Sequence, residues 1–175
     1  MKYVKIKSIV MMPKPTKAMK KFFISRTNEH IKKVRDVIKL INKLDVNVNK
    51  EILSRRGILH DKSKFGDVEY LPYVWLSEEY RKGSEFYKNL PEELNEFTRK
   101  AIESHHKHNK HHPEYYTDLN KMSNEDLAEM VADLISMGHE RGNKASDYFK
   151  SHHLKKFKFN KEQLKLVYKI FKGLK

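Results

Sequence analysis

The chain has 175 residues, 38% hydrophobic and 34% charged, and its 37 Lys and Arg against 23 Asp and Glu give a formal net charge of +14. This length suits one domain with a substantial buried core. The absence of cysteine excludes disulfide scaffolds and thiolate metal sites. No apolar run approaches the roughly 20 residues of a membrane span, and the apolar part of the basic start is too short for a signal peptide. We therefore expect a cytoplasmic protein.

The chain divides into three expected parts. Residues 1–24 form a basic N-terminal arm, residues 25–154 a helical domain, and residues 155–175 a basic C-terminal helix packed on that domain. Pro13 and Pro15 argue against a helix in the arm, which we expect to be irregular or short-stranded.

The first expected helix runs from about Ser25 to Leu44. Its apolar residues recur at three- and four-residue steps and are Ile31, Val34, Val37, Ile38, Ile41 and Leu44. His30 lies four residues before Val34 on the same stripe. We therefore expect the His30 side chain to point inward.

A second helix is expected from about Asn49 to His60. Three apolar residues mark its buried side, Ile52, Leu53 and Leu59. His60 falls seven residues after Leu53 and is followed directly by Asp61. Because Gly57 weakens the helix, we expect the His-Asp pair at a tightened helix end, where two adjacent side chains can converge.

The middle of the chain is aromatic and then rich in histidine. Residues 67–81 contain Pro72 and predict a short or kinked helix that covers or walls a site. Pro91 begins a stronger helix, whose inward stripe is Leu94, Phe97, Ala101 and His105, with Ile102 leading to His106. A polar loop follows over residues 107–116, with histidines at His108, His111 and His112.

The next helix carries a carboxylate among apolar residues. Ser123 and Asp126 predict a capping box at its start, and its inward residues are Leu127, Met130, Val131, Leu134 and Met137. Asp133 lies in the middle of this stripe, so it must be paired, protonated or bound to metal. With further helices over residues 145–154 and 160–174, the pattern predicts an all-α single-domain bundle of about six to seven helices.

Several expected inward residues on separate helices suit a metal ion. They are His30, His60, Asp61, His105 or His106, and Asp133. A single inward histidine or aspartate is more often a hydrogen-bonded core residue than a ligand. Together, however, buried imidazoles and carboxylates are costly unless a cation compensates them. Imidazole nitrogen and carboxylate oxygen suit divalent transition metals.

The order His … His-Asp … His-His … Asp resembles the HD-domain superfamily of metal-dependent phosphohydrolases. The string HDKSKF, followed by Glu69-Tyr70, HHPEYY and EMVADL, is similar to a family of small HD-like proteins of bacteria and phages. The resemblance covers roughly residues 25–140. It implies a core metal set, His30, His60, Asp61 and Asp133, to which two-metal branches add His105 and His106.

The resemblance also implies a chemistry. One or two divalent ions (Mn, Fe, Co, Zn or Ni, with Mg also considered) would promote attack of water on a phosphate ester of a nucleotide or related small molecule. Asp61 or a second carboxylate would accept a proton, and Lys64, at HD-x-x-K, would hold phosphate oxygens. His111 and His112 would bind substrate or complete a second metal site.

Two departures narrow this expectation. Lys64 stands where the nucleoside-monophosphate branch usually has glutamate, which argues against a 5′-nucleotidase. HHPEYY stands in place of the Gly-Tyr-Pro signature of the cyclic-dinucleotide branch.

The competing hypothesis is a nucleic-acid-binding protein. In it the metal site is structural or has lost its chemistry, and the basic ends bind phosphates. A phosphodiesterase acting on oligonucleotides lies between the two. The binding hypothesis depends on charge alone, because the sequence has no helix-turn-helix, RNA-binding aromatic motif or zinc finger.

Overall fold

The computed structural model describes residues 14–83 and 92–174, and within these ranges the chain is helical and has no strand. The all-α prediction is confirmed. The helices are α1 (Lys17–Ile41), α2 (Lys50–Leu59), α3 (Tyr70–Lys82), α5 (Glu92–His108), α6 (Asn124–Arg141), α7 (Ala145–Tyr148), α8 (Leu154–Lys156) and α9 (Lys161–Gly173). Between them lie the 3-10 turns η1 (Lys62–Phe65), η2 (Pro113–Tyr115) and η3 (Leu119–Lys121) and the π turn η4 (Phe149–His153).

Helix α1 begins at Lys17, eight residues before the expected start, so the expectation of an irregular arm is wrong for the described residues from Lys17 onward. The Thr16 hydroxyl caps the helix by accepting a hydrogen bond from the Met19 N–H at 3.2 Å. Pro15 precedes this cap, where proline does not interrupt a helix. Residues 1–13 lie outside the described residues.

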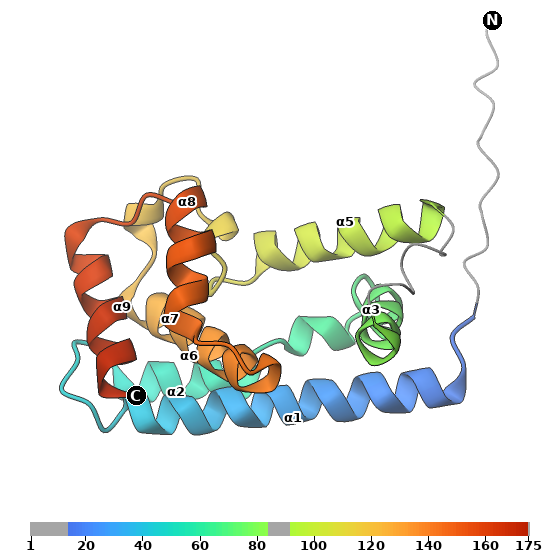
Figure 1. Cartoon of the computed structure of the whole chain (residues 1–175), viewed down its shortest axis with the longest axis horizontal. Helices are drawn as coiled ribbons and strands as arrows, with labels where there is room; N and C mark the ends of the chain where they lie inside the picture. The colour runs from blue at the N-terminus through green and yellow to red at the C-terminus, as the bar shows by residue number, and fades with distance from the viewer. Residues whose placement is uncertain (1–13, 84–91, 175) are drawn as a thin grey trace, which may run out of the picture.

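The main hydrophobic core lies between α1, α2, α6 and α9 (Figure 1). Its fully buried residues include Val34, Ile41, Leu53, Val131 and Val167. Burying a side chain of this size contributes roughly 1.5–3 kcal/mol. A smaller cluster of Met19, Phe23 and Val74 packs the first half of α1 against α3.

Helix α2 faces α1 with a different set of residues from the one expected. Leu53 is buried, but Ile52 and Leu59 are 47% and 62% exposed. The buried side is formed at four- and three-residue steps by Leu53, Gly57 and His60. A Cβ on Gly57 would lie 2.7 Å from Ile38 Cδ1. The glycine therefore permits close approach of the two helices.

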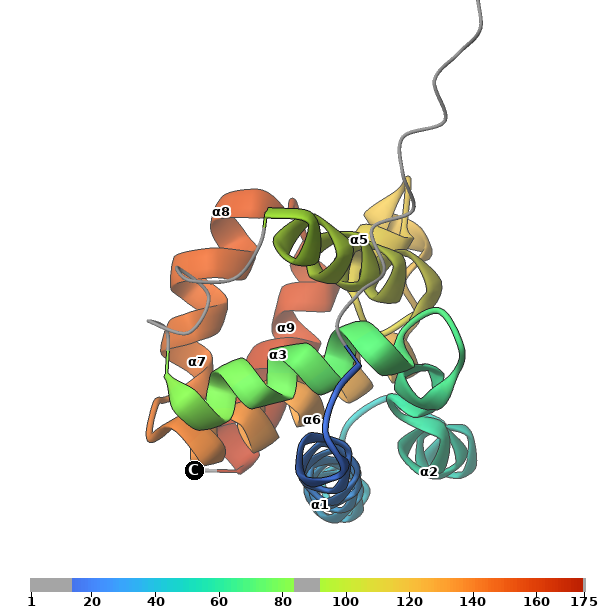
Figure 2. The same ribbon diagram turned by 90° about the vertical axis from the view of Figure 1, so that its right-hand side faces the viewer.

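Helix α3 packs on α1, and α5 packs on α3 (Figures 1 and 2). Pro72 lies in the first turn of α3, where it does not break the helix, so the expected interruption is absent from the continuous span to Lys82. Pro91 lies outside the described residues.

Helix α6 begins with the predicted capping box. The Ser123 hydroxyl accepts from the Asp126 N–H, and the Asp126 carboxylate accepts from the Ser123 N–H, both at 3.1 Å. The helix ends before Gly142, whose φ of 68° suits glycine. The chain then re-enters a continuous helical segment made of α7, the π turn and α8 (Figure 1).

Helix α9 closes the main core. Val167, Ile170 and Phe171 are buried against it, whereas its lysines are on the outside. In the part of the chain that the structure describes, each helix is too short or too polar to cross a membrane.

Candidate metal centre

The centre is built around a sharp turn at the end of α2. His60 is the residue that ends the helix, and Asp61 adopts a left-handed backbone with φ of 56°. Asp61 is the single described non-glycine residue with positive φ, and aspartate tolerates this region better than most side chains. The turn lets both side chains enter the interior, where each residue is 2% exposed. The expected tightened helix end is present.

Four side chains form what we call the first half-site, namely His30, His60, Asp61 and Asp133. His30 Nε2 lies 3.1 Å from Asp133 Oδ1, 3.6 Å from Asp61 Oδ2 and 3.3 Å from His60 Nε2. His60 Nε2 lies 3.7 Å from Asp61 Oδ2 and 3.8 Å from Asp133 Oδ1. Ligand atoms about 2 Å from one ion lie roughly 3–4 Å from each other. The first half-site could therefore hold a metal ion.

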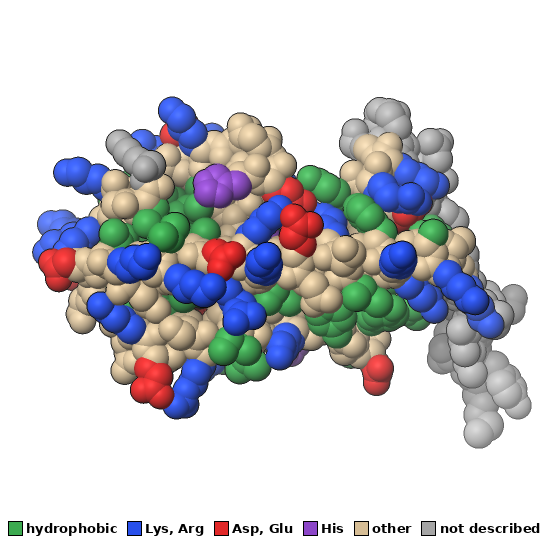
Figure 3. All heavy atoms as spheres, turned by 90° about the horizontal axis from the view of Figure 1, so that it is seen from below, with side chains coloured by type: hydrophobic (Ala, Val, Ile, Leu, Met, Phe, Trp, Pro, Cys, Tyr) green, Lys and Arg blue, Asp and Glu red, His purple; other side chains and the backbone are tan. Residues whose placement is uncertain are grey.

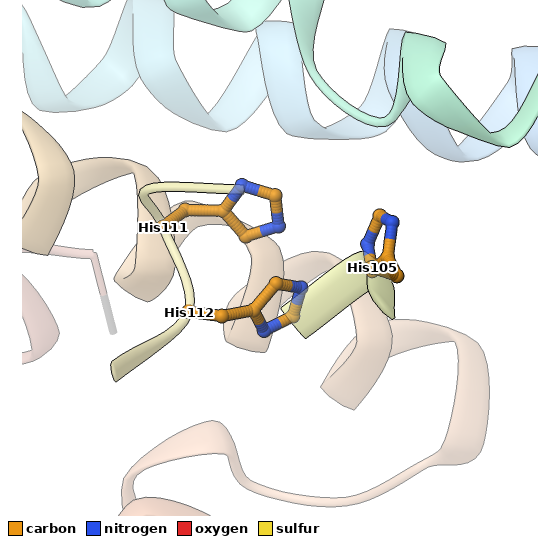
Figure 4. Close-up of side chains that lie close together, drawn as sticks. All are labelled: His105, His111 and His112. Atoms are coloured by element: carbon orange, nitrogen blue, oxygen red, sulfur yellow. The ribbon is translucent and has the colours of Figure 1, made fainter. Parts of the chain in front are cut away.

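The other oxygen of Asp61 faces a second group of histidines. Asp61 Oδ1 lies 3.1 Å from His105 Nε2 and 3.7 Å from His111 Nε2. His105, His111 and His112 offer ring nitrogens within 4.8 Å of one another. Figure 4 shows these three side chains close together, from the last turn of α5 and the loop after it. We call Asp61 Oδ1 and these histidines the second half-site.

Two buried nitrogens of the second half-site fit a cation. His111 Nε2 and His112 Nε2 have no hydrogen-bond partner among the described residues. A buried polar atom without a partner costs roughly 1–3 kcal/mol. Because a neutral imidazole nitrogen is a metal ligand, an ion between these nitrogens and Asp61 would remove that cost.

Buried carboxylates contact the Nδ1 atoms of the histidines and so orient their rings. Glu129 Oε1 lies 2.9 Å from His60 Nδ1 and 3.4 Å from His111 Nδ1, so one carboxylate serves both half-sites. Arg56 Nε donates to the other Glu129 oxygen at 2.8 Å. Metal-binding histidines commonly donate their outer N–H to a carboxylate in this way.

Glu69 has the same role for one histidine. Its Oε2 lies 2.9 Å from His105 Nδ1 and accepts a hydrogen bond from the Ser63 hydroxyl at 3.0 Å. Sequence reasoning gave neither Glu69 nor Glu129 a role at the site. The available signal for Glu129 is its place four residues before Asp133, on the same helix face.

The carboxylates shift the pKa values of two histidines upward. Burial by itself would lower the pKa of His60, but Asp61, Glu129 and Asp133 outweigh burial and raise the pKa to about 9. Burial would also lower the pKa of His105. Hydrogen bonds to Asp61 and Glu69 outweigh burial, so the pKa is raised.

The pKa values of Asp61, His111 and His112 are lowered. Burial would raise the pKa of Asp61, but Lys64, His60 and His105 hold it well below its usual range. Burial lowers the pKa of both His111 and His112, and neighbouring histidines lower it further. His111 and His112 are thus neutral, the form that binds metal.

Two predicted residues, His106 and Lys64, belong to neither half-site, and neither does the nearby His108. His106 is half-buried, with its ring 4.4 Å from that of His112 and its Nδ1 3.7 Å from Glu114, and it joins neither half-site. His108 is exposed. The Lys64 ammonium contacts the Asp61 carboxylate.

Two adjoining cavities give access to the centre. The metal lobe, of about 540 Å³, is lined by His30, Asp61, Lys64 and His105 together with Tyr73 and other residues of α3. The outer lobe, of about 840 Å³, extends toward α7 and α8. The residues that line both lobes are His106, His112, Asp133, Met137 and Arg141.

The fold and site define an all-α protein whose buried His, Asp and Glu groups could hold metal ions. The chain belongs to a family: residues 19–173 match the family of unknown function DUF5662. Searches of curated proteins and of solved structures found no match.

Proposed function

We propose that this protein is a metal-dependent phosphohydrolase that cleaves a phosphate ester of a nucleotide or a related small molecule. The observation that carries the proposal is the position of Asp61, whose two oxygens face separate groups of buried histidines at 3.1–3.7 Å. The resemblance to the HD-domain superfamily supports the same function.

Two ions fit the donor set. His30, His60, Asp61 and Asp133 would hold one, and Asp61, His105 and His111, with His112 beside them, would hold the other. The many imidazoles favour Mn, Fe, Co, Ni or Zn over Mg. When bound, such ions supply Lewis acidity toward water and phosphate oxygens.

The chain's own residues would bind the substrate and move protons. Lys64 lines the metal lobe beside Asp61, where its ammonium is placed to contact phosphate oxygens. Asp133 lines both lobes with a side chain 20% exposed, which suits a carboxylate that accepts a proton from attacking water. Burial raises the pKa of Tyr73, so its hydroxyl stays a hydrogen-bond donor to an anion in the metal lobe.

The test is phosphate release from a panel of phosphate monoesters and diesters, with each divalent ion supplied in turn. Wild type should release phosphate, and Asp61→Asn should not, because the amide loses the charge that faces both half-sites. The matched control is Asp67→Asn, the same change at an exposed residue, which should keep full activity. Full activity in Asp61→Asn, or no release by wild type from any ester, would contradict the proposal.

The nucleic-acid-binding alternative ranks below this proposal. Lys and Arg side chains are dispersed over the face shown in Figure 3 and are interspersed with Asp and Glu. A basic groove that follows a phosphate backbone would gather them. The dispersed pattern is typical of a solvated, lysine-rich surface.

A further inference from the structure

Two of the three described Lys and Arg side chains that line the metal lobe have an acidic partner within the protein. Arg26 donates two hydrogen bonds to Glu140 Oε1, the shorter at 2.8 Å. Lys64 is paired with Asp61. Arg141 also lines this lobe, and its guanidinium has no hydrogen bond or ion pair among the described residues. Uncompensated positive charge therefore lies at the border with the outer lobe.

The outer lobe contains more of this charge. Lys144 lines it and, like Arg141, lacks an ion-pair partner in the described ranges. Lys156 lines it too and is paired with Glu114 at 2.6 Å. An arginine side chain suits a phosphate group especially well, because its planar guanidinium can donate two parallel hydrogen bonds.

The turn between α6 and α7 fixes where these cations lie. A Cβ on Gly138 would be 2.7 Å from the Asn143 carbonyl oxygen, so the turn packs directly on the helix. Gly142 completes the turn with φ of 68°. Arg141 and Lys144 therefore extend from a tightly packed turn.

Aromatic side chains also line the outer lobe. Tyr148 is 39% exposed and stacks on His152, with ring centroids 4.1 Å apart and an angle of 13° between the rings. Phe157 lines the same cavity. Both Tyr148 and Phe157 flank the π turn and α8, and π turns are frequent at functional sites. Such rings suit the flat face of a nucleobase.

We infer that the outer lobe binds a second phosphate group of the substrate through Arg141 and Lys144, and that the substrate is a nucleotide with one phosphate besides that at the metal centre. This inference rests on the proposed function and deepens it. The two lobes together accommodate such a ligand, because they adjoin along Asp133 and Arg141.

A simpler role for Arg141 is to stabilise helix α6, and the experiment must distinguish this role from phosphate binding. Arg141 lies in the last turn of α6, where a cation interacts favourably with the helix dipole. That role predicts a change in thermal stability and no preference between ligands with one and two phosphates.

The experiment measures binding of adenosine 5′-monophosphate and adenosine 3′,5′-bisphosphate to the full chain by calorimetry, with Mn²⁺ and after chelation. The bisphosphate should bind wild type about tenfold more tightly, as a charged hydrogen bond worth roughly 1.5 kcal/mol implies. Arg141→Gln should remove this preference. The matched control, Arg35→Gln, changes an exposed arginine that lines neither lobe and should keep it. If Arg141→Gln does not fold, Lys144→Gln tests the same subsite.

Equal binding of the two probes to wild type would overturn the inference, as would equal losses in Arg141→Gln and Arg35→Gln. Either result in a protein that still releases phosphate would leave the proposed function standing. The opposite outcome is also distinguishable. If the protein releases no phosphate with any metal, but its preference for the bisphosphate is lost only in Arg141→Gln, the anion subsite is supported and the phosphohydrolase function is contradicted.

Discussion

The two half-sites of the candidate metal centre differ in how the fold supports them. His30, His60 and Asp133 come from α1, the end of α2 and α6, which pack on one another around the main core. His105, His111 and His112 come from the end of α5 and a loop, and α5 packs mainly on α3 and η2 (Figure 1). The first half-site is thus positioned by helix packing. The second depends more on the carboxylates that contact its histidines, Glu69 at His105 and Glu129 at His111.

The largest expected effect concerns metal and stability. An ion at 100 times its dissociation constant adds about 2.7 kcal/mol to the free energy of unfolding, which corresponds to a rise of roughly 5–11 °C in melting temperature for a chain of this size. Asp61→Asn should lose this rise for both half-sites, because it changes the residue they share. Thermal melts with and without each ion measure it. A metal-induced rise that is unchanged in Asp61→Asn would break the account.

Lys64 lies in η1, between the two half-sites. Lys64→Gln should lower turnover by roughly a hundredfold, as removal of a donor to developing charge does, while leaving metal content unchanged. Lys62→Gln is the matched control, since Lys62 is exposed in the same short turn. Steady-state kinetics and metal analysis on the same samples give both readouts. An equal loss in the two variants would show that Lys64 has no specific contact with substrate.

The orienting carboxylates sharpen the comparison between half-sites. Glu129→Gln should weaken both metal-binding steps by roughly 10–100-fold, because Glu129 contacts His60 and His111. Glu69→Gln should weaken only the step at the second half-site, since Glu69 contacts His105. Calorimetric titration of the chelated protein separates the steps. Identical profiles for the two variants would contradict this assignment.

The smallest expected effect is on stability, from an ion pair between α1 and α6, two of the helices that carry the first half-site. Arg26 of α1 and Glu140 of α6 form an ion pair with side chains 25% and 14% exposed. Burial would raise the pKa of Glu140, but Arg26 lowers it below its ordinary value of 4.5. Stability from this pair is therefore present above pH 4.5 and is lost as pH falls through the lower, folded-state pKa.

Glu140→Gln should accordingly cost about 1 kcal/mol at neutral pH, and the difference from wild type should disappear in acid. Urea unfolding at a series of pH values measures it. A cost that does not change with pH would show that packing, and not charge, links the two helices here.

Helix periodicity was sufficient to predict the inward direction of His30 and the inward position of Asp133, because each falls on a stripe of apolar residues. It was misleading for α2, where Ile52 and Leu59 were expected inside. Gly57 lets α1 approach α2 so closely that the face of α2 carrying the glycine is the buried one. Close approach of two helices is a tertiary property, and the apolar pattern of one helix does not contain it.

The second half-site was harder to predict. His105 and His106 are neighbours in the last turn of α5, and each follows an apolar residue by four positions, Ala101 and Ile102. Helix periodicity therefore does not choose between them, although only His105 reaches Asp61 among the two. Glu129 was missed because a glutamate in a helix is usually a solvated residue. Its burial depends on Arg56 and two histidines that arrive from other elements.

The most direct test of two half-sites sharing Asp61 is the number of transition-metal ions per chain, measured by native mass spectrometry. We expect two ions in wild type. We expect one in His30→Gln, which removes a ligand of the first half-site, and one in His111→Gln, which removes a ligand of the second. A single ion in wild type that both substitutions abolish, or no ion taken up at all, would contradict this expectation.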